Sequence, residues 1–407
     1  MEQKNPDSRF KEFDINWSMS PASVIFKVET DKGHPELPVL SASQELGMVK
    51  RDNIGINMQY SKQNVASYKR VQPGRFVIHL RSFQGGFAHS AIEGITSPAY
   101  TVLSLKEPEK HDDYFWKYLF ISPEFIKRLE LVTYGIRDGR SISVEDFFDL
   151  PFYYPSTPEE QHQIAKFFSR LDILIAAEDK RLARLKNMKA ASLEKMFPKQ
   201  GETTPQIRFK GFTGEWDECK LGDISNKVLE KNSKNAIQEV FTNSAEFGII
   251  SQRDFFNHDI ANVKSIFGYY VVQPNDFVYN PRMSVTAPVG PINRNKLFRS
   301  GVMSPLYYVF RVHDIHEGYL EYYFKTTHWH KFMYNNGDNG ARGDRFSIKD
   351  DTLIKMPIPM PKDEKEQIYI ADFFSRLDTL ISAQEQKVSK LRSLKKSFLE
   401  KMFVTLQ

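Results

Sequence analysis

Apolar residues recur at every third or fourth position through two long stretches of the chain, residues 160–197 and 366–403. That spacing is typical of amphipathic helices, because it places the apolar side chains along one face. The positions between them are mostly charged or polar. Counted from its expected cap, each helix would be about 60 Å long at the standard rise per residue, which is too long for the interior of one small domain. We therefore expect each helix to face a partner helix.

The two stretches are copies of one another. They share the segments EQ, IA, FFSRLD and LEKMF at matching positions and are identical at more than half of their residues. Glu178 and Gln384 interrupt the apolar stripe at equivalent places, and a polar residue in such a seam can fix the register of two paired helices. The residues that we expect to pack the helices and to dock partners are Phe167, Phe168, Leu171, Ile175, Phe373, Phe374, Leu377 and Ile381.

Both helices begin with duplicated capping signals. Thr157 is a suitable N-cap, Pro158 is a suitable first helical residue, and Glu160 stands at the third helical position. Asp363 and Glu366 occupy the equivalent cap and third positions in the second copy. This pattern predicts a capping box at each helix, in which the glutamate closes on the backbone of the cap.

The duplication extends to the segments before the helices. Residues 9–17 and 208–216 share the frame RFKxFxxxW, and we expect its aromatic residues to pack the first strand of each domain. Proline-rich segments that we expect to be extended precede the helices at 150–155 and 356–361. A chain of 407 residues is too long for one simple core. The expected domains are 1–156 and 200–362, each followed by a helical segment, 157–199 and 363–407.

Each globular segment mixes strand and helix signals. Short runs rich in β-branched and aromatic residues, bounded by Gly, Pro or Asn, predict strands at 75–80, 100–105, 276–280 and 307–312. Residues 114–128 and 319–334 predict short amphipathic helices. The expected fold class is therefore α+β, with two mixed domains in tandem and a modest sheet in each.

Composition and charge narrow the class of protein only a little. With 41% hydrophobic and 26% charged residues, the chain has the composition of a soluble globular protein. It contains no apolar run long enough to cross a membrane and no signal peptide at its first residues, so we expect a cytoplasmic location without membrane contact. The single cysteine, Cys219, excludes an internal disulfide. A net charge of +5 favours nucleic acid slightly.

The two copies differ most in residues 81–93 and 281–300, between strands that both retain. Loops rich in glycine and arginine also precede the helices, at 134–140 and 336–345. Arginine can bridge guanine O6 and N7, and asparagine or glutamine can pair with adenine N6 and N7. The expected DNA contacts are Arg81, Gln84, Arg282, Asn293 and Arg294 in the divergent segments, with Arg137, Arg140, Arg342 and Arg345 in the loops. Irregular turns whose arginines pair with nearby carboxylates remain an alternative.

Catalytic signatures are missing from the sequence. There is no Asp/Asn-Pro-Pro-Tyr/Phe motif of adenine methylation, no phosphate-binding Gly-Lys-Ser/Thr loop, and no dinucleotide fingerprint. Asp363-Glu364-Lys365 resembles the end of a nuclease motif, but a helix cap explains it better. The histidines at 313, 316, 328 and 330 lack clustered acidic or cysteine partners. We expect no catalytic residues, no metal and no cofactor.

These landmarks together resemble one family. Two variable segments, each followed by a proline-rich arm, an EQxxIAxFFSRLD helix start and a helix ending in LEKMF, resemble the specificity (S) subunit, HsdS, of type I restriction-modification enzymes. The resemblance covers essentially the whole chain. Within the RFKxFxxxW frame, the second copy has the Gly-Phe pair of the family pattern and the first copy lacks it. This difference bears only on how the first domain begins.

The resemblance implies both an architecture and a function. The two helices would form an antiparallel coiled coil that separates the domains with pseudo-two-fold symmetry. Each domain would be a target recognition domain reading one half of a bipartite site in double-stranded DNA. Two modification subunits would dock on the helices and supply methylation, and restriction subunits would add translocation and cleavage. The helix length would set the spacer between half-sites, and this chain would perform no chemistry.

Two other classes of function remain open from the sequence. The helices could form an interaction coil in a protein–protein scaffold whose domains bind peptides. The chain could also act outside a restriction system or mimic DNA, although mimicry needs an acidic surface and this chain has a net positive charge.

Overall fold

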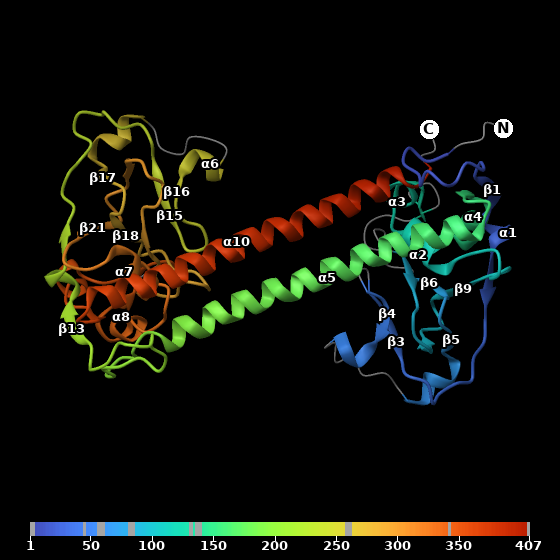
Figure 1. Ribbon diagram of the computed structural model, residues 1–407, viewed down its shortest axis with the longest axis horizontal. Coiled ribbons are helices and arrows are strands. Elements are labelled where there is room, and N and C mark those ends of the chain that lie inside the picture. The colour runs from blue at the N-terminus through green and yellow to red at the C-terminus, as the bar shows by residue number, and fades with distance from the viewer. Residues whose placement is uncertain are drawn as a thin grey trace. The chain divides into compact units, whose positions relative to one another are not determined.

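The computed structural model describes residues 5–43, 46–54, 62–79, 86–129, 133–134, 141–256, 263–340 and 343–404. The chain divides into two compact units, the first formed by Met1–Lys180 with Glu385–Gln407 and the second by Arg181–Gln384. Each unit combines one globular domain with a part of each long helix (Figure 1).

The first unit contains these elements in chain order: β1 (Ser18–Pro21), α1 (Ala22–Ile25), β2 (Phe26–Glu29), β3 (Leu40–Ser43), β4 (Gly47–Lys50), β5 (Lys69–Val71), β6 (Phe76–Ile78), β7 (Phe87–His89), β8 (Gly94–Thr96), β9 (Thr101–Leu105), α2 (Asp113–Phe120), α3 (Pro123–Leu129), β10 (Thr133–Tyr134), β11 (Ser141–Ile142), α4 (Val144–Asp149) and β12 (Pro151–Tyr154). Short 3-10 helices span Arg51–Ile54 and Lys62–Ser67.

The second unit repeats that order closely. Its elements are β13 (Asp217–Lys220), β14 (Ser225–Lys227), β15 (Phe241–Ser244), β16 (Gly248–Ser251), α6 (Gln252–Phe256), β17 (Tyr270–Val272), β18 (Phe277–Tyr279), β19 (Ile292–Arg294), β20 (Gly301–Met303), β21 (Tyr308–Val312), α7 (Glu317–Tyr323), α8 (His330–Asn336), β22 (Asp338–Asn339), β23 (Phe346–Ser347), α9 (Asp350–Leu353) and β24 (Pro357–Met360). Short 3-10 helices span Leu221–Asp223 and Val263–Gly268.

The two domains share one sheet topology. A four-stranded antiparallel sheet has the order β2-β9-β6-β7 in the first domain and β14-β21-β18-β19 in the second. All four strands expected from the sequence are present, as β6, β9, β18 and β21. Each segment expected to be helical is divided into two helices, and in the first domain Ile121 and Ser122 separate α2 from α3, which begins at Pro123. The proline-rich arms are extended as expected, because β12 pairs with β1 and β24 pairs with β13.

The long helices α5 (Pro158–Lys195) and α10 (Glu364–Lys401) confirm the main expectation from the apolar pattern. In the first unit, the ring of Phe167 meets that of Phe398 at 4.9 Å between centroids. In the second unit, Phe197 stacks on Phe374 at 6.1 Å. Within each unit, contacts farther along α5, or just past its end at Phe197, are made to residues farther back along α10, as the ion pairs below also show. The paired helix segments are therefore antiparallel.

Ion pairs also join the two long helices within each unit. Lys395 Nζ lies 2.5 Å from Asp172 Oδ1 in the first unit, and Lys189 Nζ lies 2.5 Å from Asp378 Oδ1 in the second. Glu178, which interrupts the apolar stripe, pairs with Lys387 at 2.6 Å. The polar interruption in the first unit is therefore matched by a cation on the facing helix.

The prediction of a capping box at the two helix starts is wrong, because neither glutamate side chain bonds to the backbone of its cap in the described structure. Glu160 is almost fully buried, and its carboxylate accepts two hydrogen bonds from Arg9, at 2.6 and 2.7 Å. Glu366 accepts the same pair of bonds from Arg208, at 2.6 and 2.8 Å. The glutamates turn away from the caps because a guanidinium forms two parallel charge-assisted bonds, which are stronger than one bond to a backbone N–H. The cap at Asp363 is present, since its side chain accepts from the Lys365 N–H at 2.9 Å.

The RFKxFxxxW frame therefore fastens each domain to its helix. Its first phenylalanine packs edge-on against the helix, Phe10 on Phe167 and Phe209 on Phe373, each at 6.0 Å. Trp17 is buried and donates from Nε1 to Glu160 at 3.2 Å. The expectation that the aromatic residues of the frame pack the first strand of each domain did not include this role, because the sequence alone does not show which glutamate the arginine meets.

Candidate nucleic-acid interface

Two of the expected DNA contacts in the second domain lie side by side. Arg282 and Arg345 form an antiparallel backbone bridge, although Arg282 comes from the divergent segment 281–300 and Arg345 from the glycine- and arginine-rich loop 336–345. The bridge is extended by hydrogen bonds from Met283 N to Asp344 O at 3.0 Å and from Phe346 N to Pro281 O at 2.7 Å. Both arginines are exposed, and neither forms an ion pair with any residue that the structure describes. The fold thus places the backbones of two exposed arginines side by side.

The other two described candidates have partners inside the protein. Asn293 is 4% exposed; its amide donates to Asn243 Oδ1 at 2.6 Å, and its oxygen accepts from Lys325. Arg294 binds Glu321 at 2.7 Å. A base could bind these side chains only if those bonds broke first. Their role as base contacts stays a prediction, and the structure favours Arg282 and Arg345 over them.

The remaining candidates, Arg81, Gln84, Arg137, Arg140 and Arg342, lie outside the described residues. They stay predictions from the sequence.

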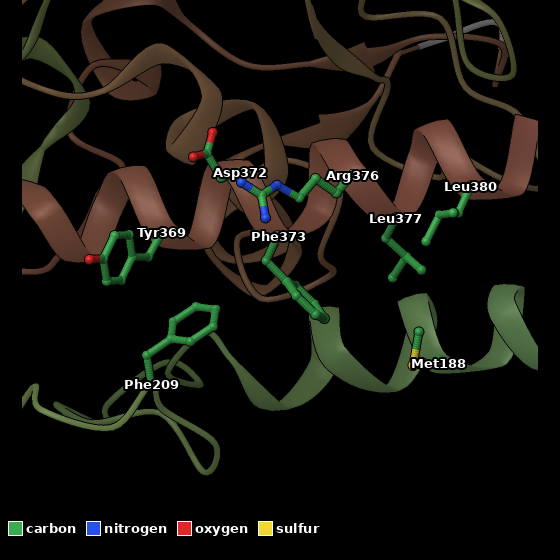
Figure 2. Close-up of a pocket in the computed structure, with 8 residues that line it drawn as sticks. All are labelled: Met188, Phe209, Tyr369, Asp372, Phe373, Arg376, Leu377 and Leu380. Atoms are coloured by element: carbon green, nitrogen blue, oxygen red, sulfur yellow. The ribbon is translucent and has the colours of Figure 1, made fainter.

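A cavity of about 360 Å³ in the second unit includes some of the expected docking residues. Figure 2 shows Phe373 and Leu377 reaching from α10 toward α5, where Met188 faces them. Tyr369 is 53% exposed and Leu380 is 52% exposed, so this groove presents apolar surface to solvent. The remaining lining residues are Phe209, Asp372 and Arg376.

Other helix residues in the expected docking set are interior. Phe374 is fully buried between Phe197 and Tyr322, and Phe168 is fully buried against Tyr118 and Phe403. Phe167 and Leu171 pack partly buried against the core of the first unit. Ile175 and Ile381 are half-buried. The set therefore separates into residues that hold a domain to its helix and residues that line an open groove.

Beside Arg345 lies a second cavity of about 300 Å³ that the sequence did not predict. Tyrosines line it, together with Lys227, whose ammonium lies 5.3 Å from the centre of the Tyr308 ring and 2.5 Å from Asp350. Aromatic rings beside cations suit nucleic acid. Its tyrosines, Tyr270, Tyr279, Tyr307 and Tyr308, are scattered over three strands and a turn, so only the fold reveals them as a group.

No group of histidine, cysteine, aspartate and glutamate suited to a metal ion occurs among the described residues. The histidines have other contacts: His316 Nδ1 accepts from the Tyr319 N–H at 3.4 Å, and His328 lies 3.0 Å from the carbonyl of Pro198. In the described parts of the chain, no helix is long and apolar enough to span a membrane.

The sequence model of the type I restriction modification DNA specificity domain matches the chain twice, over residues 24–187 and 213–392. The chain belongs to this family. A search of curated proteins found no match. Each matched segment covers most of one domain and most of the long helix that follows it, so the duplication noted in the sequence is a duplication of the family's domain.

Solved structures show the same fold. The crystal structure of a type I restriction-modification S subunit from M. genitalium has a TM-score of 0.57 and 14% identity, and the match covers 99% of this chain and 100% of that one. A chain from a study of the assembly and conformational transition of the type I R-M system has a TM-score of 0.55 and 16% identity, with 95% and 97% covered. The chain is accordingly a DNA specificity subunit of the type I restriction-modification class.

Proposed function

We propose that each domain reads one half of a bipartite DNA target, and that the chain performs no chemistry itself. The observation that supports this most strongly is the meeting of the divergent segment at Arg282 and the glycine- and arginine-rich loop at Arg345, on a frame that the first domain repeats. A retained frame with changed loops is what two readers of different sequences require. Guanidinium groups that are exposed and unpaired within the described chain can each bridge a guanine or bind phosphate.

The helices would hold the two readers and bind the catalytic partners. Each is 38 residues long, which corresponds to about 57 Å at the standard rise. Half-sites one helical turn apart are separated by about 34 Å along DNA. Two modification subunits would dock on the two duplicated helix surfaces, and restriction subunits would join the full complex.

The proposal predicts a one-sided loss of specificity. Changing Arg282→Ala together with Arg345→Ala should relax recognition in only one half of the target, because both arginines belong to the second domain. Each lost bidentate contact is worth about 1–3 kcal/mol of discrimination, or roughly 5- to 150-fold at that base. Methylation mapping of DNA modified by the whole complex measures both halves at once.

A matched control removes charge without touching these loops. Lys234→Ala with Lys355→Ala takes two exposed cations from the same domain and should leave both halves intact. Equal degradation of both halves by the arginine variant would show that one domain does not read one half-site. If cells with and without the wild-type chain had the same methylation pattern, the specificity role itself would be excluded and a scaffold would become the better reading.

If a modification subunit docks in the groove of the second unit, removing side chains from the groove should weaken its binding. Tyr369→Ala with Leu380→Ala removes two large exposed side chains from its lining, and truncating an anchoring residue such as a tyrosine at the centre of an interface costs about 2 kcal/mol or more. The affinity for an isolated modification subunit should fall about 10-fold or more. Ile207→Ala, which is 49% exposed in the same unit but outside the groove, serves as the control. Calorimetric titration showing equal affinity for all three chains would rule out docking in the groove.

A further inference from the structure

The first unit contains a cavity of about 610 Å³ where its domain meets the long helices. The turn between β3 and β4, strand β7 and helix α2 contribute the domain side. Helices α5 and α10 contribute the other side, including Arg392 and Lys395. Phe87 and His89 in the lining belong to the divergent segment 81–93, which the sequence predicts to contact DNA. The cavity is therefore continuous with the expected reading surface of the first domain.

Lys117 is the unusual residue of this cavity. Its ammonium lies 5.2 Å from the centre of the Tyr114 ring and 5.1 Å from that of Tyr118. Within the described part of the chain it forms no salt bridge and no hydrogen bond. Burial lowers the pKa of this ammonium, because a less hydrated cation is less stable. Asp172 and Asp113 act on this ammonium through space and oppose that shift by raising its pKa, but neither forms a salt bridge with it in the described structure.

Two further cations line the same cavity. Lys395 lies 5.6 Å from the centre of the Tyr118 ring and pairs with Asp172, and Arg392 pairs with Asp179 at 2.8 Å. Asp172 also accepts a hydrogen bond from the Tyr118 hydroxyl at 2.8 Å. Both carboxylates of the lining are thus already bonded, and the cations outnumber them by one. The surplus positive charge is that of Lys117.

The second unit shows that the fold does not need this charge. There, Tyr322 donates to Asp378 at 2.9 Å and Lys189 pairs with the same carboxylate, which repeats the arrangement of Tyr118, Asp172 and Lys395. One residue before each tyrosine, however, the second unit has Glu321 where the first has Lys117. Glu321 is itself neutralised by Arg294 and Lys296. The same framework forms with a carboxylate in place of the ammonium, so Lys117 is not required to build it.

We propose that this cavity is a phosphate site that takes one phosphate of the DNA backbone, bound by Lys117 with help from Lys395 and Arg392. The inference rests on the proposed function and assigns to the first domain a contact that fixes DNA without reading its sequence. Phosphate contacts from lysine and arginine position a protein on the duplex and carry no base preference. The site belongs to the first domain alone, because Glu321, already bonded to Arg294 and Lys296, supplies no ammonium at the equivalent place.

Salt dependence of DNA binding tests the assignment. Lys117→Met keeps the length of the side chain and removes the charge, so loss of one phosphate contact should reduce the slope of log affinity against log salt by about 0.9. The measurement uses the full chain with modification subunits, on target DNA and on unrelated DNA. Affinity should fall by the same factor on both, while the methylated sequence stays the same. Lys127→Met, which removes an exposed cation from α3, should leave the slope unchanged.

Stability separates binding from a structural role. Lys117→Met should unfold at the same temperature as wild type or higher, because it removes an unpaired, half-buried charge; a lower temperature would indicate a structural lysine and overturn the inference. An unchanged slope in a folded variant would also overturn it, while specific methylation by the wild-type complex would leave the proposed function standing. Titration of the full chain with inorganic phosphate and with a mononucleotide distinguishes the source: tight, Lys117-dependent binding of the free anion with no change in DNA affinity would contradict a DNA phosphate.

Discussion

Replacing Arg208 by methionine should destabilise the second unit by about 3–5 kcal/mol. The Glu366 side chain is 2% exposed and Arg208 is its bidentate partner, so the variant would leave a buried carboxylate without its countercharge. Because this carboxylate sits in the first turn of α10, the loss should spread to the packing of the domain on the helix. Hydrogen exchange of peptides from the second unit during denaturant unfolding measures the effect separately from the first unit.

The equivalent change in the first unit should cost less. In Arg9→Met the Glu160 carboxylate retains the Trp17 Nε1–H as a donor, whereas Trp216 Nε1 has no hydrogen-bond partner in the described structure. Changing Arg208→Met together with Glu366→Leu should recover much of the stability, since a buried pair can often be replaced by apolar residues of similar volume.

An exposed ion pair provides the control for these changes. Lys362 and Asp217 lie 3.2 Å apart with side chains 64% and 58% exposed, so Lys362→Met should change stability by less than about 1 kcal/mol. If Arg208→Met were no more destabilising than Lys362→Met, the buried pair would not be what fastens the domain to the helix.

The repeated apolar pattern was sufficient to predict the long helices and their pairing, and runs of β-branched and aromatic residues predicted two strands of each four-stranded sheet. Those features depend on periodicity and on the self-similarity of the chain, which one sequence displays in full. The position of Glu160 also predicted a helix start correctly. It did not predict the bond that the glutamate makes, because a cap backbone and a distant arginine compete for the same carboxylate and only the fold brings Arg9 within reach.

The candidate site was less predictable for the same reason. Residue type identified Arg282, Arg345, Asn293 and Arg294 as possible base readers, but type does not show which side chains find partners within the protein. Glu321, Asn243 and Lys325 lie far from Asn293 and Arg294 in sequence, and they bond to them in the fold. Lys117 carried no signal in the sequence, since its importance depends on the absence of a salt-bridge partner within the described chain.

The two domains are joined to their long helices by equivalent contacts. We therefore predict that the first domain can replace the second. Gln161 accepts a hydrogen bond from the Asp112 N–H at 3.0 Å, and Gln367 accepts one from the His316 N–H at 2.9 Å. The strands β1 and β12 close the first domain in the register in which β13 and β24 close the second. A chain in which residues 18–154 replace 217–360 should therefore fold with the first domain present twice.

Methylation mapping of DNA modified by that chain, in complex with modification subunits, decides whether each domain reads its own half of the target. Because the paired helix segments are antiparallel in both units, the expected target is an inverted repeat of the first half-site. Recognition of the second half-site should disappear, with a loss of at least about 10³-fold, since each mismatched base pair costs about 1–3 kcal/mol. A target that keeps the wild-type second half, or loses both halves, would contradict the assignment of one domain to one half-site.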